Sequence, residues 1–187
     1  MRIVGGVYKG KKLQAPDGDT TRPTSDRARE SLFNILSSLL LKEDKKWSEI
    51  VFVDVFAGTG AIGLEAASRG AKKVFFIERD QKALKCLANN SKEFKEITIL
   101  GIDATKVPFS KTPAQIIFMD APYHTQLWEL ALDGLLKKGW IDKEAFVIIE
   151  VEKNETATLP TSFLLKEERI YGRNKLLFCQ KTNEKDL

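Results

Sequence analysis

Apolar runs alternate with helical patterns through most of the chain. Runs suited to buried strands occupy residues 51–55, 73–77, 97–100, 115–119 and 145–151. Helical spacing of apolar positions is expected between them, over residues 64–67, 81–94 and 127–136. Continuous apolar strands separated by helices are typical of a parallel sheet that is covered on both faces. The pattern therefore predicts an α/β fold with a doubly wound sheet.

Both ends of the chain depart from this alternation. Residues 163–171 and 175–180 are predicted to form two strands that turn at Tyr171, Gly172 and Arg173. Residues 3–6 and 7–13 are predicted to form a small hairpin, and a helix is expected over 26–41, capped by Thr24 or Ser25. We expect a largely parallel seven-stranded sheet with a C-terminal antiparallel hairpin, in a single domain over 1–187. Residues 1–20 would be a hairpin extension and residues 21–187 the core.

Charge permits an anionic partner without requiring one. The chain has 187 residues, with 30 Lys and Arg against 26 Asp and Glu, which gives a formal charge of +4. Basic residues gather near the amino terminus, where they can contact the phosphates of a nucleic acid. The candidates for this contact are Arg2, Lys9, Lys11, Lys12, Arg22 and Arg27.

Several classes of protein are disfavoured by what the sequence lacks. Cys86 and Cys179 are far apart and form no C-x-x-C pattern, so we expect reduced core thiols rather than zinc or a disulfide. His124 is the only histidine, and no metal site is expected. No signal-peptide pattern opens the chain and no apolar run reaches the length of a membrane span. We therefore expect a soluble cytoplasmic protein.

A glycine-rich loop follows the first predicted strand of the sheet. Its residues 56–63 fit the pattern G-x-G-x-x-G, and the candidate binding positions are Phe56, Ala57, Gly58 and Gly60. Glycines let a ligand approach the backbone closely, although they also serve ordinary strand-to-helix turns. In open parallel sheets, ligands bind outside the carboxyl ends of the strands.

Acidic residues occur at successive strand ends. Glu78 lies twenty residues after Gly58, where a carboxylate can accept hydrogen bonds from both ribose hydroxyls of a nicotinamide dinucleotide or of S-adenosylmethionine. Asp54 favours S-adenosylmethionine, because an acid there suits the methionine end and repels a pyrophosphate. Asp103 can accept from an adenine amino group. Each acid alone is equally suited to a capping or solvated position.

The segment Asp120, Ala121, Pro122 and Tyr123 ends the strand 115–119. The Asp120 carboxylate and the Ala121 carbonyl can accept hydrogen bonds from an exocyclic amine of a nucleobase, while the Tyr123 ring stacks on the base. The alternative is an ordinary strand end followed by an X-Pro turn. Together with the glycine loop and the acids, the segment favours an amine-methylating enzyme.

The sequence resembles the RsmD family, class I S-adenosylmethionine-dependent methyltransferases that act on guanine N2 of 16S rRNA. The resemblance covers nearly the whole chain and is carried by the motifs at residues 2–6, 9–11, 21–27, 30–34, 54–60 and 68–71. It implies that residues 54–63 wrap the methionine part, Glu78 holds the ribose, and Asp103 and Ala104 lie by the adenine. Thr24, in the segment from Arg22 to Arg27, would help to close over the cofactor or meet RNA. Residues 120–123 correspond to the family's D-P-P-[YF], with Ala121 in place of the first proline.

The implied mechanism is in-line attack of guanine N2 on the methyl group of S-adenosylmethionine, with Asp120 and the Ala121 carbonyl orienting the amine. The target base would be flipped out or lie in single-stranded rRNA, naked or within a partly assembled small subunit, and the enzyme would act as a monomer. Three alternatives stay open: adenine-N6 or cytosine-N4 methylation of RNA or DNA, a nicotinamide-dependent oxidoreductase, and a non-catalytic RNA-binding protein.

Overall fold

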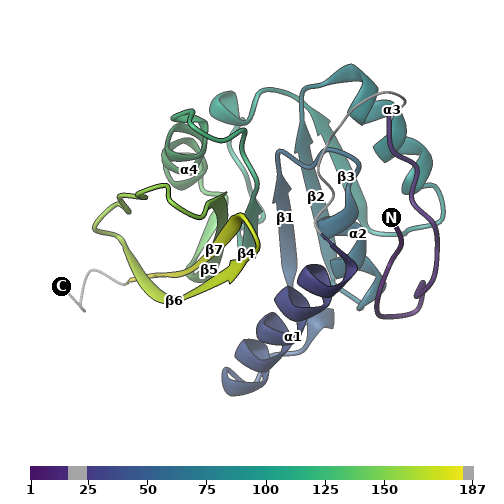
Figure 1. Cartoon of the computed structure of the whole chain (residues 1–187), viewed down its shortest axis with the longest axis horizontal. Helices are drawn as coiled ribbons and strands as arrows, with labels where there is room; N and C mark the ends of the chain where they lie inside the picture. Colours follow the sequence, from purple (N-terminus) through teal and green to yellow (C-terminus); the bar gives the residue numbers. More distant parts are fainter. Residues whose placement is uncertain (17–24, 183–187) are drawn as a thin grey trace.

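The structure, a computed structural model, describes residues 1–16 and 25–182 and is built on one seven-stranded sheet (Figure 1). The strand order is β3-β2-β1-β4-β5-β7-β6. The parallel strands are β1 (Val51–Val55), β2 (Lys73–Glu78), β3 (Ile97–Gly101), β4 (Ala114–Met119) and β5 (Ile141–Glu152). Strands β7 (Asn174–Lys181) and β6 (Phe163–Tyr171) add to them in antiparallel fashion. The predicted fold class and the C-terminal hairpin are confirmed.

Helices cover both faces of the sheet. They are α1 (Asp26–Lys42), α2 (Ala61–Ser68), α3 (Gln81–Asn90) and α4 (Leu127–Lys137), with short 3-10 turns η1 (Trp47–Glu49) and η2 (Ala104–Lys106). Alternate residues of β1 divide between two cores: Val53 packs beneath α4, whereas Phe52 packs with α1 and α2. The result is a three-layer arrangement in which every central strand is buried on both faces, as the continuous apolar runs predict.

Local sequence sets where the helices begin and end. The Ser25 hydroxyl accepts a hydrogen bond from the Ala28 N–H at 3.1 Å and caps α1, while the other predicted cap, Thr24, lies outside the described residues. Asp80 caps α3 in the same way. The helical pattern predicted as far as residue 94 overshoots, because α3 ends at Asn90 and Phe94 instead reaches the core from the turn that follows.

The predicted N-terminal hairpin is present, but it is shorter than predicted. Within the described residues it has one antiparallel bridge, between Arg2 and Lys12, and hydrogen bonds from the Ile3 N–H to the Lys11 carbonyl at 2.9 Å and from the Leu13 N–H to the Met1 carbonyl at 3.0 Å. Gly6 (φ 76°) and Gly10 (φ 91°) turn the backbone into the left-handed region, so an alternating ladder cannot continue through them.

The backbone groups of this N-terminal arm (residues 1–16) also pair with α2. The N–H of Val4 donates to Glu65 Oε2 at 2.8 Å, and the N–H of Val7 donates to the carbonyl of Ser68 at 2.8 Å. The Ile3 side chain of the arm is fully buried. Contacts to a distant helix, together with the short hairpin, therefore hold the amino terminus on the body of the protein.

The two cysteines differ in their surroundings. Cys179 is buried and unpaired, and burial raises its pKa to about 12, so it is an inert core thiol. Cys86 is only half-buried on α3, and the expectation of a core position is wrong for it. Within residues 1–16 and 25–182, no helix is long and apolar enough to cross a membrane.

Candidate active site

A cavity of about 650 Å³ opens at the carboxyl ends of the central strands. It lies where the chain order reverses between β1 and β4, the position at which open α/β sheets bind ligands. Most of the predicted site residues line it: Asp54, Phe56, Ala57, Gly58, Glu78, Asp103, Ala104, Asp120, Ala121, Pro122 and Tyr123. Four separate strand ends thus contribute to one cavity.

The glycine loop between β1 and α2 bends sharply at alternate positions. Phe56 (φ 60°), Gly58 (φ 54°) and Gly60 (φ 81°) all adopt the left-handed region, which is uncommon for a bulky residue such as Phe56. A Cβ built on Gly58 would meet no atom within 4 Å, so the backbone there faces open space. Gly60 is not on the cavity wall: it begins α2, and a Cβ there would lie 2.3 Å from the Leu87 side chain.

Glu78 joins the end of β2 to this loop. Its Oε2 accepts a hydrogen bond from the Gly58 N–H at 2.8 Å, and its Oε1 accepts from the N–H groups of Arg79 and Asp80, each at 2.7 Å. Three backbone donors therefore fix the carboxylate at the cavity wall. Because each carboxylate oxygen can accept more than one hydrogen bond, capacity is left for a ligand.

Asp54 lies beneath the loop and is only 2% exposed. Its Oδ2 accepts a hydrogen bond from the Gly63 N–H at 2.8 Å, which ties β1 to the first turn of α2. Burial raises the pKa of Asp54 to about 8, and the nearby Glu78 charge adds to the rise, while the Gly63 hydrogen bond opposes it. The side chain thus has a structural partner besides its place on the cavity wall.

Asp103 follows β3 and caps η2. Its Oδ1 accepts from the backbone N–H and the hydroxyl of Thr105, and its Oδ2 accepts from Arg79 at 3.0 Å. The Thr105 hydrogen bonds, with help from Arg79, lower the pKa of Asp103. Asp103 is therefore an ionised acceptor with partners of its own, and the buried Ala104 beside it provides the flat apolar wall of this end of the cavity.

The segment after β4 brings its acid to the wall of the cavity. The Asp120 carboxylate has no hydrogen-bond partner within the described part of the chain. Burial raises its pKa well above the usual range, and the carboxylates of Glu150 and Asp54 raise it further. Ala121 is buried, and the Thr125 hydroxyl donates to the Pro122 carbonyl at 2.6 Å.

Glu150, near the end of β5, is a further acid in the site that the sequence analysis does not single out. It is 3% exposed and lines the cavity. Phe118 pairs with Ile148 in the β4–β5 register, so two residues further on Glu150 lies beside Asp120 on the same face of the sheet. A lone acid inside an apolar strand, as at Asp54, is the sequence signal that could have found it.

Only one of the two carboxylate oxygens of Glu150 accepts hydrogen bonds from the described residues. Its Oε1 accepts hydrogen bonds from the Tyr123 hydroxyl at 3.3 Å and from the Asn174 amide. Its Oε2 is buried and has no partner among the described residues. Burial raises the pKa of Glu150, and the hydrogen bonds from Asn174 and Tyr123 oppose the rise.

A second cavity of about 630 Å³ adjoins the first. It lies between the start of α1 and the β6–β7 turn, and the two cavities share Glu150 and Asn174 on their walls. Arg27 and Arg173, both exposed, line it. The Tyr171 hydroxyl is within 2.7 Å of the Ser31 hydroxyl on its wall.

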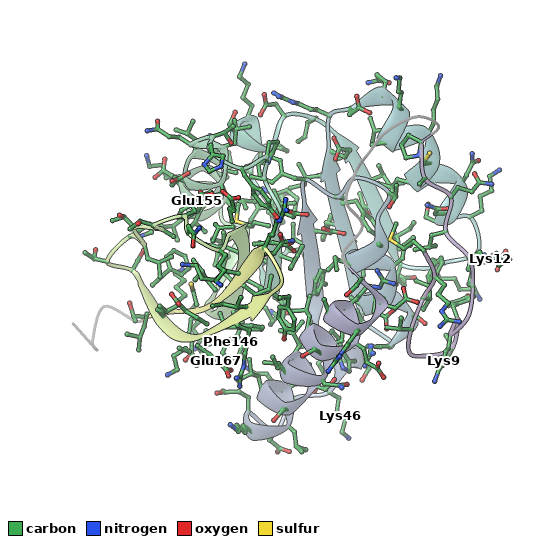
Figure 2. All side chains as sticks on the ribbon, in the orientation of Figure 1. Lys9, Lys12, Lys46, Phe146, Glu155 and Glu167 are labelled. Carbon is green, nitrogen blue, oxygen red and sulfur yellow. The ribbon has the colours of Figure 1, made fainter. Side chains whose placement is uncertain are left out.

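The other predicted RNA contacts lie on the N-terminal arm. Lys9 and Lys12 are exposed on its outer side (Figure 2). Arg2 forms an ion pair with Asp26 at 2.9 Å, and Lys11 forms one with Glu93 at 2.7 Å. The remaining candidate for RNA contact, Arg22, lies outside the described residues. Among the residues that the structure describes, no group of three or more His, Cys, Asp or Glu side chains is arranged to hold a metal ion.

The fold and the site together define a class I methyltransferase. The sheet is doubly wound, a glycine loop follows β1, an acid lies at the end of β2, and an acid lies beside an aromatic residue after β4. The family model described as Conserved hypothetical protein 95 matches residues 1–180, and the chain belongs to this family, the RsmD family. The resemblance stated from the sequence is thereby confirmed, as is the class of enzyme.

Relatives agree with this assignment over nearly their whole length. The chain is 34% identical to the ribosomal RNA small subunit methyltransferase D of Escherichia coli K12 over 177 residues, which is 92% of this chain and 86% of the relative. It is 32% identical to the protein of the same name from Haemophilus influenzae, covering 92% and 89%. The solved structure of the Escherichia coli protein yhhF superposes with a TM-score of 0.83 at 33% identity, covering 97% and 98%.

Proposed function

We propose that this methyltransferase transfers a methyl group from S-adenosylmethionine to the exocyclic N2 of a guanine in small-subunit rRNA. The observation that carries the donor is the acidic lining of the cavity, where Asp54, Glu78, Asp120 and Glu150 all lie on the wall and a cationic ligand favours their ionised forms. S-adenosylmethionine has a sulfonium and an ammonium group, which acids attract, whereas the pyrophosphate of a nicotinamide dinucleotide would be repelled. The rRNA substrate is supported by relatives named small subunit methyltransferase D.

The chain has suitable partners for each part of the donor. The open space beside Gly58 admits a ligand against the loop backbone, Glu78 has acceptor capacity for ribose hydroxyls, and Ala104 offers an apolar surface for the adenine. The volume of about 650 Å³ is within the range usual for ligand pockets. When bound, S-adenosylmethionine supplies an electrophilic methyl on a cationic sulfur, which becomes a neutral thioether as the new N–C bond forms and the C–S bond breaks.

The residues after β4 would hold the amine. The unpartnered Asp120 carboxylate and the Ala121 carbonyl accept from its two N–H groups, which aligns the nitrogen lone pair for in-line attack. As the nitrogen becomes positive, the Asp120 carboxylate stabilises it, and the carboxylate then receives the amine proton or passes it to water. Tyr123, half-buried at the cavity wall, presents its ring to the base.

The second cavity gives the RNA strand a path next to the target. A base that reacts at the carboxyl ends of the strands must leave its helix, so the flanking backbone has to run over the protein surface. The guanidinium groups of Arg27 and Arg173 line the space that joins the first cavity at Glu150. Arginine is well suited to phosphate because its fork of donors can bind two oxygens together.

The direct test uses purified protein, labelled S-adenosylmethionine and 16S rRNA, either deproteinised or within small ribosomal subunits. Nucleoside digestion should place the label in N2-methylguanosine. Label in N6-methyladenosine or N4-methylcytidine would replace the guanine assignment, and no transfer to either substrate would refute the rRNA assignment. Isothermal titration should show binding of S-adenosylhomocysteine and none of NAD; the reverse would refute the donor.

A further inference from the structure

The Oε2 atom of Glu150 is an anomaly that the fold does not explain. Its side chain is 3% exposed, and Oε2 is buried without a hydrogen-bond partner among the described residues. A buried polar atom that is left unpaired destabilises the protein, and more so when it is charged. Since the side chain lies on the cavity wall beside the proposed acceptors, a ligand is the natural source of the missing donor.

The surroundings of Glu150 strengthen the need for a donor. Asp120 lies next to it on the same face of the sheet, and neither carboxylate forms an ion pair with Lys or Arg in the described ranges. Burial raises the pKa of both carboxyl groups, and the nearby Glu150 raises that of Asp120 further. Hydrogen bonds donated by a ligand favour the ionised carboxylates and relieve this cost.

The Watson–Crick edge of guanine offers a matching set of donors. It presents N1–H beside the two N–H groups of N2. Adenine has an acceptor at N1 beside its N6 amine, and cytosine has an acceptor at N3 beside its N4 amine. Asp120 and the Ala121 carbonyl account for the amine in all three bases, so the atom that faces Glu150 distinguishes guanine from the other two.

We propose that Glu150 is the specificity-determining residue of this enzyme, accepting a hydrogen bond from N1–H of the target guanine. The proposal rests on the proposed function and deepens it, because it names the group that selects the base. An ionised Glu150 would face a lone pair on adenine or cytosine and reject them, as sites built around one hydrogen-bond pattern do.

Glu150→Gln isolates this role. A glutamine Oε1 can still accept from Tyr123 and from Asn174, the two partners that the glutamate Oε1 has now. Its Nε2 replaces the unpartnered Oε2 with a donor of nearly the same size. The substitution therefore reverses the sense of one hydrogen bond while the other two and the packing of β5 are kept.

The test compares RNA that carries guanine at the target position with RNA that carries 2-aminopurine there. 2-Aminopurine keeps the reactive 2-amino group but has an acceptor at N1. Because it also lacks O6, the change in the guanine to 2-aminopurine ratio between enzymes, rather than the ratio itself, reports on N1. The wild type should prefer guanine in kcat/KM, and Glu150→Gln should lower this preference about 10- to 100-fold by gaining on 2-aminopurine.

Glu152→Gln is the matched control. Glu152 is two residues further along β5 and pairs with His124 at 2.9 Å, and this variant should keep the wild-type ratio. An unchanged ratio in Glu150→Gln that still binds S-adenosylhomocysteine would overturn the proposal. Failure of the wild type on guanine RNA would instead refute the proposed function.

Discussion

Asp120→Asn should separate cofactor binding from methyl transfer. The carboxylate has no hydrogen-bond partner in the described protein, so replacing it with an amide of the same shape breaks no contact of the fold. The amide oxygen can still accept a hydrogen bond from the amine. What is lost is the negative charge beside the nitrogen, which becomes positive only as the N–C bond forms.

The size of the effect follows from that charge. A full positive charge about 3 Å from the carboxylate is stabilised by about 5.5 kcal/mol at an effective dielectric constant of about 20. With about half of the charge developed in the transition state, the stabilisation is about 2.8 kcal/mol, which corresponds to a rate loss of about 100-fold. Burial and the like charge of the nearby Glu150 oppose ionisation of Asp120, so the wild-type rate should rise with pH as the carboxyl group, with its raised pKa, becomes ionised.

Single-turnover transfer of labelled methyl to guanine RNA, with titration of S-adenosylhomocysteine, measures the two quantities separately. Asp120→Asn should lower the transfer rate by about 100-fold, flatten its pH dependence and leave the affinity for S-adenosylhomocysteine within about twofold. Asp133→Asn, an exposed acid on α4 that pairs with Lys137 at 2.8 Å, is the control and should change neither. A loss of affinity as large as the loss of rate would refute the reasoning and make Asp120 a structural residue.

Three further outcomes are expected. Burial raises the folded-state pKa of Asp54 to about 8 from 3.8, so the folded protein keeps a proton that the unfolded chain releases. The ligand-free protein should therefore lose stability as the pH rises from about 4 to 8. In urea unfolding, the free energy of unfolding of Asp54→Asn should depend less on pH than that of the wild type. Gly6→Ala should destabilise the fold by about 3 kcal/mol or more, since its φ is 76° and its Cβ would lie 1.9 Å from the last carbonyl oxygen of α2. Gly10→Ala, with open space around it, should lower the free energy of unfolding by only about 1–2 kcal/mol. Thermal unfolding of both glycine variants measures this difference. Replacing Arg27 and Arg173 together by alanine should raise KM for rRNA about tenfold without changing cofactor affinity, and an unchanged KM in steady-state kinetics would place the RNA elsewhere.

The central strands were predictable because burial on both faces leaves a direct trace in the sequence. Strand β1 is an apolar run interrupted only by Asp54, and its bounds agree with the prediction at 51–55. Strand β5 instead begins at Ile141, four residues before the predicted start, through a polar stretch that contains Asp142 and Lys143. Its first residue pairs with Ala114 of β4 across a register shift, and such pairing cannot be seen in the local pattern.

In the candidate site too, some residues could be predicted from the local sequence and others could not. Glu78 and Asp120 could be singled out because each follows an apolar strand directly, at the edge where a parallel sheet binds ligands. Glu150 lies inside a strand, and only the β4–β5 register shows that it adjoins Asp120. The N-terminal hairpin is shorter than predicted for a related reason, since the Val4 N–H that a longer strand pair would use is taken by Glu65 of α2. Contacts between distant segments decide both cases.

Ala121 is the position at which the chain departs from the family's D-P-P-[YF]. A proline there would fix its own φ, whereas an alanine leaves it free in an isolated peptide. In the fold, however, the N–H of Asp120 contacts the Val55 carbonyl at 3.4 Å, and Pro122 restricts Ala121 to extended conformations. The buried Ala121 side chain and the Thr125 hydrogen bond to Pro122 hold the segment from the other side. Because tertiary contacts flank the residue on both sides, the fold constrains the Ala121 backbone without the rigidity of a second proline ring.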